Sequence, residues 1–157
     1  MMITLDAPIP DFQAQATSGL RVQSSALVGQ QYLLYFYPKD STPGCTTEAQ
    51  DFRDRFAQFQ QANTLIFGVS RDTLRSHENF RRKQELPFEL ISDANEHLCQ
   101  LFDVLKMKKL YGREYLGIER SSFLIDQHGV LRYQWRNLKV KGHADQVLEA
   151  AQALQSQ

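Results

Sequence analysis

The clearest pattern along the chain is a short apolar run followed by an amphipathic one. The run over 32–37 has the length of a strand, is rich in aromatic residues and is ended by Pro38, which predicts a buried β-strand. From about 45 to 61, apolar side chains recur at helical spacing between charged ones, which predicts an α-helix with one buried face. The apolar positions of that face are Ala49, Phe52, Phe56 and Phe59. The segment 32–61 is therefore predicted to run strand, loop, helix.

The rest of the chain alternates predicted strands with predicted helices. Strands are expected over 64–70 and 88–91, a hairpin over 122–126 and 130–135, and a smaller N-terminal hairpin from 12–14 and 20–22. A short helical turn is expected over 24–29, and longer helices over 74–85 and from about Ala144 onward. A further helix is expected to begin after a cap at Asp93 or Asn95 and to bury Leu98, Leu101 and Phe102. The lysine-rich segment 106–110 is predicted to be a solvated loop. This order favours an α/β fold with a central sheet flanked by helices.

Composition narrows the class of protein. The length of 157 residues is typical of one domain spanning 1–157, and 42% hydrophobic with 23% charged residues are ordinary globular values. Eighteen basic and eighteen acidic side chains argue against a nucleic-acid binder that neutralises phosphates. No segment has the pattern of a membrane span or a secretion signal. Two cysteines cannot build a disulfide scaffold, so we expect a reducing, cytoplasmic compartment.

Cys45 stands where the predicted helix begins. Thr42 followed by Pro43 has the form of an N-cap with proline at the first helical position, which makes Cys45 the third helical residue. The Thr42 hydroxyl is then expected to accept from the Cys45 backbone N–H, and the helix dipole is expected to favour a thiolate, the nucleophilic form. Gly44 leaves room beside the sulfur for a small substrate. The alternative is a buried, inert cysteine at a helix start.

Other chemistries find less support in the sequence. The histidines, His77, His97, His128 and His143, lack ligand spacing and are expected to be surface residues; His97 and Cys99 form a pair too small for a zinc site. A cysteine–histidine hydrolase would need a histidine partner for Cys45, and nothing in the sequence nominates one. No glycine-rich segment has the spacing of a phosphate-binding loop. No metal and no cofactor are therefore expected.

Two segments resemble the peroxiredoxins, specifically the PrxQ or bacterioferritin-comigratory-protein group. The first carries the family motif of proline, three residues, threonine, two residues and cysteine, flanked by Tyr35-Phe36-Tyr37 and Thr46-Thr47-Glu48; it reads Pro38-Lys39-Asp40-Ser41-Thr42-Pro43-Gly44-Cys45. The second segment is 115–126, where the family supplies an arginine near the active cysteine, here Arg120. The resemblance extends from about residue 5 to the C-terminal helix, and it implies a thioredoxin-like fold.

The resemblance also implies an activity and a role for each matching residue. The activity is reduction of hydrogen peroxide and organic hydroperoxides through a sulfenic acid at Cys45. Thr42 would hold the thiolate and the incoming peroxide through its hydroxyl, Arg120 would place a positive charge beside the sulfur, and Pro38 would shape and shield the pocket. Glu48 would support the site from the first turn of the helix, where the dipole favours an acidic residue.

The sequence departs from the group at the resolving cysteine, the thiol that removes the sulfenic acid. Gln50 and the segment 80–82 occupy the two positions where group members carry it. Cys99 is the one remaining candidate, and its leucine neighbour suggests a core position. We therefore expect an external thiol to recycle Cys45, such as thioredoxin, glutaredoxin or glutathione, in a protein that is a monomer. The alternative is a non-catalytic thioredoxin-fold redox sensor or chaperone.

Overall fold

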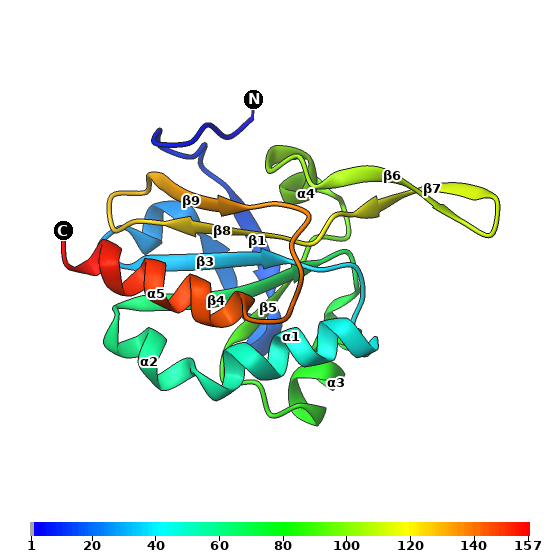
Figure 1. The fold of residues 1–157 in the computed structure, drawn as a ribbon, viewed down its shortest axis with the longest axis horizontal. Helices are drawn as coiled ribbons and strands as arrows, with labels where there is room; N and C mark the ends of the chain where they lie inside the picture. The colour runs from blue at the N-terminus through cyan, green and yellow to red at the C-terminus, as the bar shows by residue number, and fades with distance from the viewer. Residues whose placement is uncertain (1) are drawn as a thin grey trace.

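A computed structural model describes residues 2–157 and is built around the apolar run identified above. That run forms β3, Gln31–Phe36, which is buried along its whole length. It lies near the middle of a seven-stranded sheet with the strand order β2-β1-β5-β4-β3-β8-β9. β3 pairs in parallel with β4, Thr64–Ser70, and antiparallel with β8, Ser121–Ile125. The sheet is therefore mixed, and both neighbours of β3 cover its backbone groups (Figure 1).

The other elements follow the predicted order. The remaining strands of the sheet are β1 Gln13–Ala16, β2 Arg21–Gln23, β5 Glu89–Ser92 and β9 Leu131–Trp135. The helices are α1 Pro43–Asp54, α2 Phe56–Gln61, α3 Leu74–Lys83, α4 His97–Leu101 and α5 His143–Gln155, with short 3₁₀ turns at Thr17–Gly19 and Ser24–Leu27. β1 and β2 are antiparallel neighbours, as are β8 and β9. The predicted α/β fold and both predicted hairpins are therefore confirmed.

The sheet divides the core into two apolar layers. Side chains alternate along β3, so Leu33 and Tyr35 point into one layer while Leu34 and Phe36 point into the other. The first layer is covered by α1, α2, α3 and α5, of which α1, α2 and α5 are seen together along one side of the sheet in Figure 1. The second layer is covered by α4 and the N-terminal segment. Residues assigned to different layers are therefore separated by the sheet.

The predicted helix over 45–61 is interrupted. α1 ends at Asp54 and α2 starts at Phe56, with Arg55 between them at φ −110° and ψ 8°. The Arg55 guanidinium donates to the carbonyl of Asp51 and pairs with Asp145 on α5, so the side chain is held where the chain bends. The apolar positions continue across the break on the same face, which is why the periodicity alone predicted one helix.

The prediction of a loop over 106–110 is wrong. Leu105–Leu110 forms β6, which pairs antiparallel with β7, Arg113–Ile118, in a separate two-stranded sheet. Tyr111 and Gly112 connect them with φ values of 51° and 78°, the positive angles of a tight two-residue hairpin turn. Over 105–108 lysines alternate with apolar residues, and this pattern fits a solvent-exposed strand better than a loop. The hairpin projects from the body of the molecule as an arm (Figure 1).

Among residues 2–157, no helix combines the length and the apolar character needed to cross a membrane.

Candidate active site

Cys45 is the third residue of α1, at the end of the segment that leads out of β3. Its side chain is almost fully buried, with 2% of the residue exposed. The predicted helix start is therefore confirmed, including Pro43 in the first turn. The N-terminal end of a helix of twelve residues presents unpaired N–H groups and a positive partial charge near the sulfur. This surrounding favours a negatively charged sulfur.

Thr42 occupies the N-cap position, but its side chain does not cap the helix. Its hydroxyl instead donates to the carbonyl oxygen of Lys39, at 2.8 Å. The expectation that the hydroxyl accepts from the Cys45 N–H is therefore wrong, since the chain folds back so that the hydroxyl faces Lys39. With its proton directed at Lys39, the oxygen of Thr42 keeps lone pairs that can accept a hydrogen bond from another molecule.

Arg120 reaches the sulfur from the segment between β7 and β8. Its Nη2 donates to Cys45 Sγ at 3.4 Å, and its Nη1 donates to Glu48 Oε1 at 2.6 Å. Burial of the guanidinium opposes its charge, but the carboxylate of Glu48 and the Cys45 sulfur outweigh that cost, so the pKa of Arg120 is raised. Residues 75 positions apart in the sequence thus form one cluster, with a permanent positive charge at the sulfur.

Glu48 lies in the second turn of α1 and is 1% exposed. The prediction that it sits in the first turn, where the helix dipole favours an acid, is therefore wrong; the side chain is held by Arg120 instead. Burial raises the pKa of Glu48 to about 7, and Arg120 opposes this rise. Its Oε2 is buried without a hydrogen-bond partner in the described chain, as is the hydroxyl of Tyr35. No pattern in the sequence indicates the pairing of Glu48 with Arg120.

Gly44 gives the guanidinium space. A Cβ added at this residue would lie 3.3 Å from Arg120 Nη2, which is closer than ordinary van der Waals contact. The space that the sequence suggested for a substrate is thus partly filled by Arg120. Pro38 lies half-buried in the connection between β3 and α1, so it borders the same loop as Thr42. Its role in shaping the pocket stays a prediction.

Cys99 does not join this cluster. It is fully buried on α4 in the second core layer, whereas Cys45 belongs to the first. The N-cap residue of α4 is Glu96, not the predicted Asp93 or Asn95. The Asp93 side chain still accepts from the backbone N–H of Cys99 at 2.7 Å, and burial together with Asp93 raises the pKa of the Cys99 thiol. The two sulfurs are therefore separated by the sheet. Gln50, where group members carry a resolving cysteine, pairs with Gln84 at 2.9 Å.

The four histidines divide into two exposed and two buried residues. His97 and His128 are exposed as predicted, but His77 and His143 are buried, so the expectation of surface positions is wrong for these two. The Nε2 atom of His143 lies 2.8 Å from the Ser122 hydroxyl. Burial lowers the pKa of His143 to about 4, so it is neutral at pH 7. No signal in the sequence distinguishes the two buried histidines from the two exposed ones.

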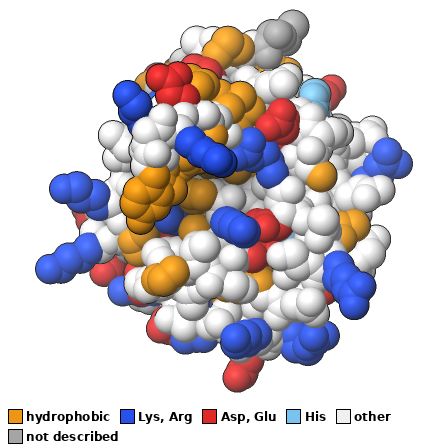
Figure 2. Space-filling model, turned by 90° about the vertical axis from the view of Figure 1, so that its right-hand side faces the viewer, with side chains coloured by type: hydrophobic (Ala, Val, Ile, Leu, Met, Phe, Trp, Pro, Cys, Tyr) orange, Lys and Arg blue, Asp and Glu red, His pale blue; other side chains and the backbone are white. Residues whose placement is uncertain are grey.

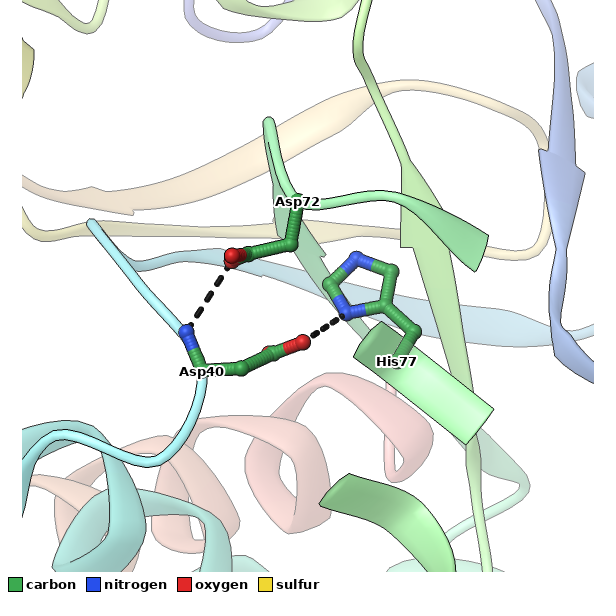
Figure 3. A group of neighbouring side chains, drawn as sticks. All are labelled: Asp40, Asp72 and His77. Carbon is green, nitrogen blue, oxygen red and sulfur yellow. Dashed lines mark hydrogen bonds and ion pairs between the residues drawn. The ribbon is translucent and has the colours of Figure 1, made fainter. Parts of the chain in front are cut away.

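His77 forms a cluster with Asp40 and Asp72 whose ligand-type atoms lie within 4.8 Å of one another (Figure 3). Such a spacing could hold a metal ion, but the atoms already have protein partners. Asp40 accepts from the hydroxyls of Tyr37 and Ser76 and is hydrogen-bonded to His77, and Asp72 Oδ2 accepts from the backbone N–H of Asp40. The cluster therefore fits a closed hydrogen-bond network better than a metal site.

The hairpin β6–β7, whose second strand ends two residues before Arg120, exposes apolar side chains. Its large exposed residues are Met107, Leu110, Tyr111, Tyr115 and Leu116. Figure 2 faces this end and shows hydrophobic side chains gathered beside lysines and arginines. Lys108, in the middle of β6, donates to the carbonyl of Ile118 at the base of the hairpin at 2.5 Å, and burial lowers the pKa of Lys108.

Comparison with known proteins agrees with this geometry. Residues 5–134 match the AhpC/TSA family. The chain is 47% identical over 152 residues to peroxiredoxin Bcp of Xanthomonas campestris, covering 97% of this chain and 95% of that protein, and 47% identical over 149 residues to peroxiredoxin Bcp of Bacillus subtilis, covering 95% of each. Peroxiredoxin Q of X. campestris superposes with a TM-score of 0.89 at 45% identity over 96% of this chain and 99% of that one. A PrxQ mutant of Xylella fastidiosa gives 0.91 at 38% identity over 98% of each chain. The chain belongs to the AhpC/TSA family and, within it, to the peroxiredoxins of the Bcp or PrxQ group.

Proposed function

We propose that this chain is a thiol peroxidase that reduces hydrogen peroxide and organic hydroperoxides at Cys45. The observation that carries the proposal is the contact of 3.4 Å between Arg120 Nη2 and Cys45 Sγ at the start of α1. Helix N–H groups and a guanidinium that keeps its proton favour the thiolate, and the thiolate is the nucleophile. A structure of the X. campestris relative was described for alkyl peroxide reduction, which supports organic hydroperoxides as substrates here.

The reaction is a displacement at oxygen. The Cys45 thiolate attacks the terminal oxygen of the peroxide, an S–O bond forms and the O–O bond breaks. The other oxygen leaves with its electron pair and takes a proton, which gives water or an alcohol, and the sulfur becomes a sulfenic acid. Donors close to the departing oxygen stabilise its developing charge. Arg120 and the first-turn N–H groups of α1 are the donors that we propose for this role.

Thr42, Pro38 and Glu48 complete the proposed site. The Thr42 hydroxyl donates to Lys39, so we propose that it accepts from the peroxide O–H and orients the attacked oxygen, and does not donate to the sulfur. Pro38 would shield the loop from water. Glu48 would hold Arg120 through its contact of 2.6 Å, so that one terminal nitrogen stays directed at the sulfur.

Recycling is proposed to use an external thiol. A thiol attacks the sulfenic acid, which releases water and forms a mixed disulfide with Cys45. A second thiol then releases Cys45 as thiolate and leaves with the first as a disulfide. Thioredoxin, glutaredoxin and glutathione are the candidate donors. All of them require a reducing compartment, which is why we propose the cytoplasm, and the monomeric state stays a prediction.

The first turnover tests this proposal. One equivalent of hydrogen peroxide, mixed with the reduced protein, should be consumed rapidly, and Cys45→Ser should abolish this consumption. Cys99→Ala is the matched control, because it removes the other thiol and should leave the rate unchanged. Rapid consumption by Cys45→Ser would disprove the assignment. A redox sensor or chaperone would react once and then stop with each of the three reductants, so steady-state assays separate that alternative from a peroxidase.

A further inference from the structure

His77 is the one charged-type side chain of α3 that is completely buried, and both of its ring nitrogens have partners. Nε2 lies 2.9 Å from the carbonyl oxygen of Ile91 on β5. A carbonyl oxygen only accepts, so Nε2 carries a proton. Nδ1 lies 2.7 Å from Asp40 Oδ2 (Figure 3). His77 thus connects β5 to the loop that precedes Cys45.

Asp40 is hydrogen-bonded to three side chains. The Tyr37 hydroxyl donates to Oδ1 at 2.6 Å, and the Ser76 hydroxyl donates to Oδ2 at 2.8 Å beside His77. Burial raises the pKa of Tyr37, so its hydroxyl keeps the proton that it donates. An unprotonated ring nitrogen and a carboxylate oxygen are both acceptors, so a proton lies between Nδ1 and Oδ2 and joins the two side chains by a hydrogen bond.

The network fixes the backbone of the loop as well as its side chain. The backbone N–H of Asp40 donates to Asp72 Oδ2 at 3.0 Å, and the hydroxyl of Ser70 on β4 donates to the same oxygen. The next residue, Ser41, has a φ of 64°, a left-handed conformation that is uncommon outside glycine and needs support from its surroundings. Asp40 and Ser41, which are held in this way, directly precede Thr42, and Cys45 follows three residues later.

We propose that His77 is a positioning residue of the peroxide-reducing site. Through its hydrogen bond with Asp40, it holds the loop 38–42 against α3 and β4, which fixes the Thr42 hydroxyl relative to the start of α1. Among residues 2–157, the hydrogen-bond partners of the His77 ring are Tyr37, Asp40 and Ile91, and not Cys45 or Arg120. The inference rests on the proposed function, because the rate that it controls is that of Cys45 with peroxide. A displacement of a reacting group by about 1 Å can cost about a hundredfold in rate, so an untethered loop should be measurably slower.

Two substitutions of His77 separate positioning from simple stabilisation. In His77→Asn the side-chain amide can take the place of Nδ1 and donate to Asp40, while the bond to Ile91 is lost. In His77→Gln the amide can take the place of Nε2 and donate to Ile91, while the bond to Asp40 is lost. Each variant removes one buried hydrogen bond, so both should lose thermal stability to a similar extent.

The readouts are the second-order rate constant for the first oxidation of Cys45 by hydrogen peroxide and the midpoint of thermal unfolding. We expect His77→Gln to react at least about tenfold more slowly than the wild type, and His77→Asn to stay within about threefold. Equal rates in the two variants, or rates that follow the unfolding midpoints, would overturn the inference. A wild type that does not react with peroxide would instead refute the proposed function, so the two failures are distinguishable.

Ser76→Ala provides a gentler version of the same experiment. It removes one donor to Asp40 from a half-buried position and leaves the buried ring in place, so the variant should fold even where changes at His77 prevent folding. We expect a severalfold slower first oxidation. Thr73→Ala is the matched control, because the Thr73 hydroxyl caps α3 through the Ser76 N–H and does not contact Asp40. A loss of rate in the control equal to that in Ser76→Ala would count against the inference.

Discussion

Arg120 and Glu48 make a short contact, 2.6 Å between Nη1 and Oε1, while the second terminal nitrogen of the guanidinium faces the Cys45 sulfur at 3.4 Å. One rigid planar group therefore links a buried carboxylate to the nucleophile. Because the guanidinium cannot bend between its nitrogens, a shift of Glu48 is transmitted to the contact with Cys45.

Arg120→Ala should lower the rate of the first oxidation of Cys45 by hydrogen peroxide. The loss of a donor that is aimed at the reacting atoms costs about 10²- to 10³-fold in comparable sites. Arg120→Lys should recover only part of this loss, since an ammonium cannot contact Glu48 and the sulfur through two fixed nitrogens. Stopped-flow oxidation by hydrogen peroxide measures the rates of both variants. Full activity of Arg120→Lys would contradict the geometric part of the argument.

Glu48→Gln should change how stability depends on pH. Burial raises the pKa of Glu48 from 4.5 to about 7, so the folded state retains a proton that the unfolded state has already lost. The stability that this group contributes is present below about pH 4.5 and is lost as the pH rises through about 7. Glutamine does not titrate, so the decrease in unfolding free energy from about pH 5 to about pH 8 should shrink by up to about 3 kcal/mol. Urea unfolding at both pH values measures it.

The useful comparison is the difference between the variant and the wild type at each pH. His143 has an opposite dependence, because its lowered pKa gives stability above about pH 6.5 that is lost as the pH falls through about 4. That contribution is common to both proteins and cancels. Identical pH dependence in Glu48→Gln and the wild type would show that the carboxyl does not titrate in this range.

Gly44→Ala should make the protein more stable and less active. Alanine in the first turn of α1 removes the conformational freedom of glycine from the unfolded chain, a gain of roughly 0.5–1 kcal/mol. The new Cβ would lie 3.3 Å from Arg120 Nη2, so the guanidinium must move from the position in which it contacts the Cys45 sulfur. We expect a decrease of about tenfold in the first oxidation rate. A variant with unchanged rate would show that Arg120 tolerates the displacement.

Cys99→Ala should leave turnover with each reductant within about twofold of the wild type. Cys99 is in the core layer on the other side of the sheet from Cys45, while a disulfide needs Cα atoms roughly 4.4–6.8 Å apart. After one equivalent of peroxide, non-reducing peptide mapping should find no bond between Cys45 and Cys99. A quantitative bond, together with lost turnover in the variant, would make the enzyme a two-cysteine type that rearranges during its cycle.

The sequence predicted the parts of the fold that depend on local pattern. The buried run of β3, the alternation of strands and helices, and Cys45 at a helix start all follow from spacing and from proline positions. Contacts between distant segments were not predictable in this way. The Glu48–Arg120 pair and the burial of His77 depend on which segments the sheet brings together, and polar side chains give no periodic signal of their partners. The resemblance to a known family supplied Arg120, but not the partner that orients it.

The sheet between the two sulfurs has a consequence for the irreversible oxidation of Cys45. With recycling from outside, a Cys45 sulfenic acid has two fates: attack by an external thiol, or oxidation by a second peroxide to the sulfinic acid, which is not readily reversed. Both reactions are bimolecular, so the ratio of the peroxide concentration to the thiol concentration decides which product forms. No internal thiol competes with these two reactions. Molecules with Cys45 in the sulfinic form would then accumulate whenever peroxide exceeds the supply of reductant.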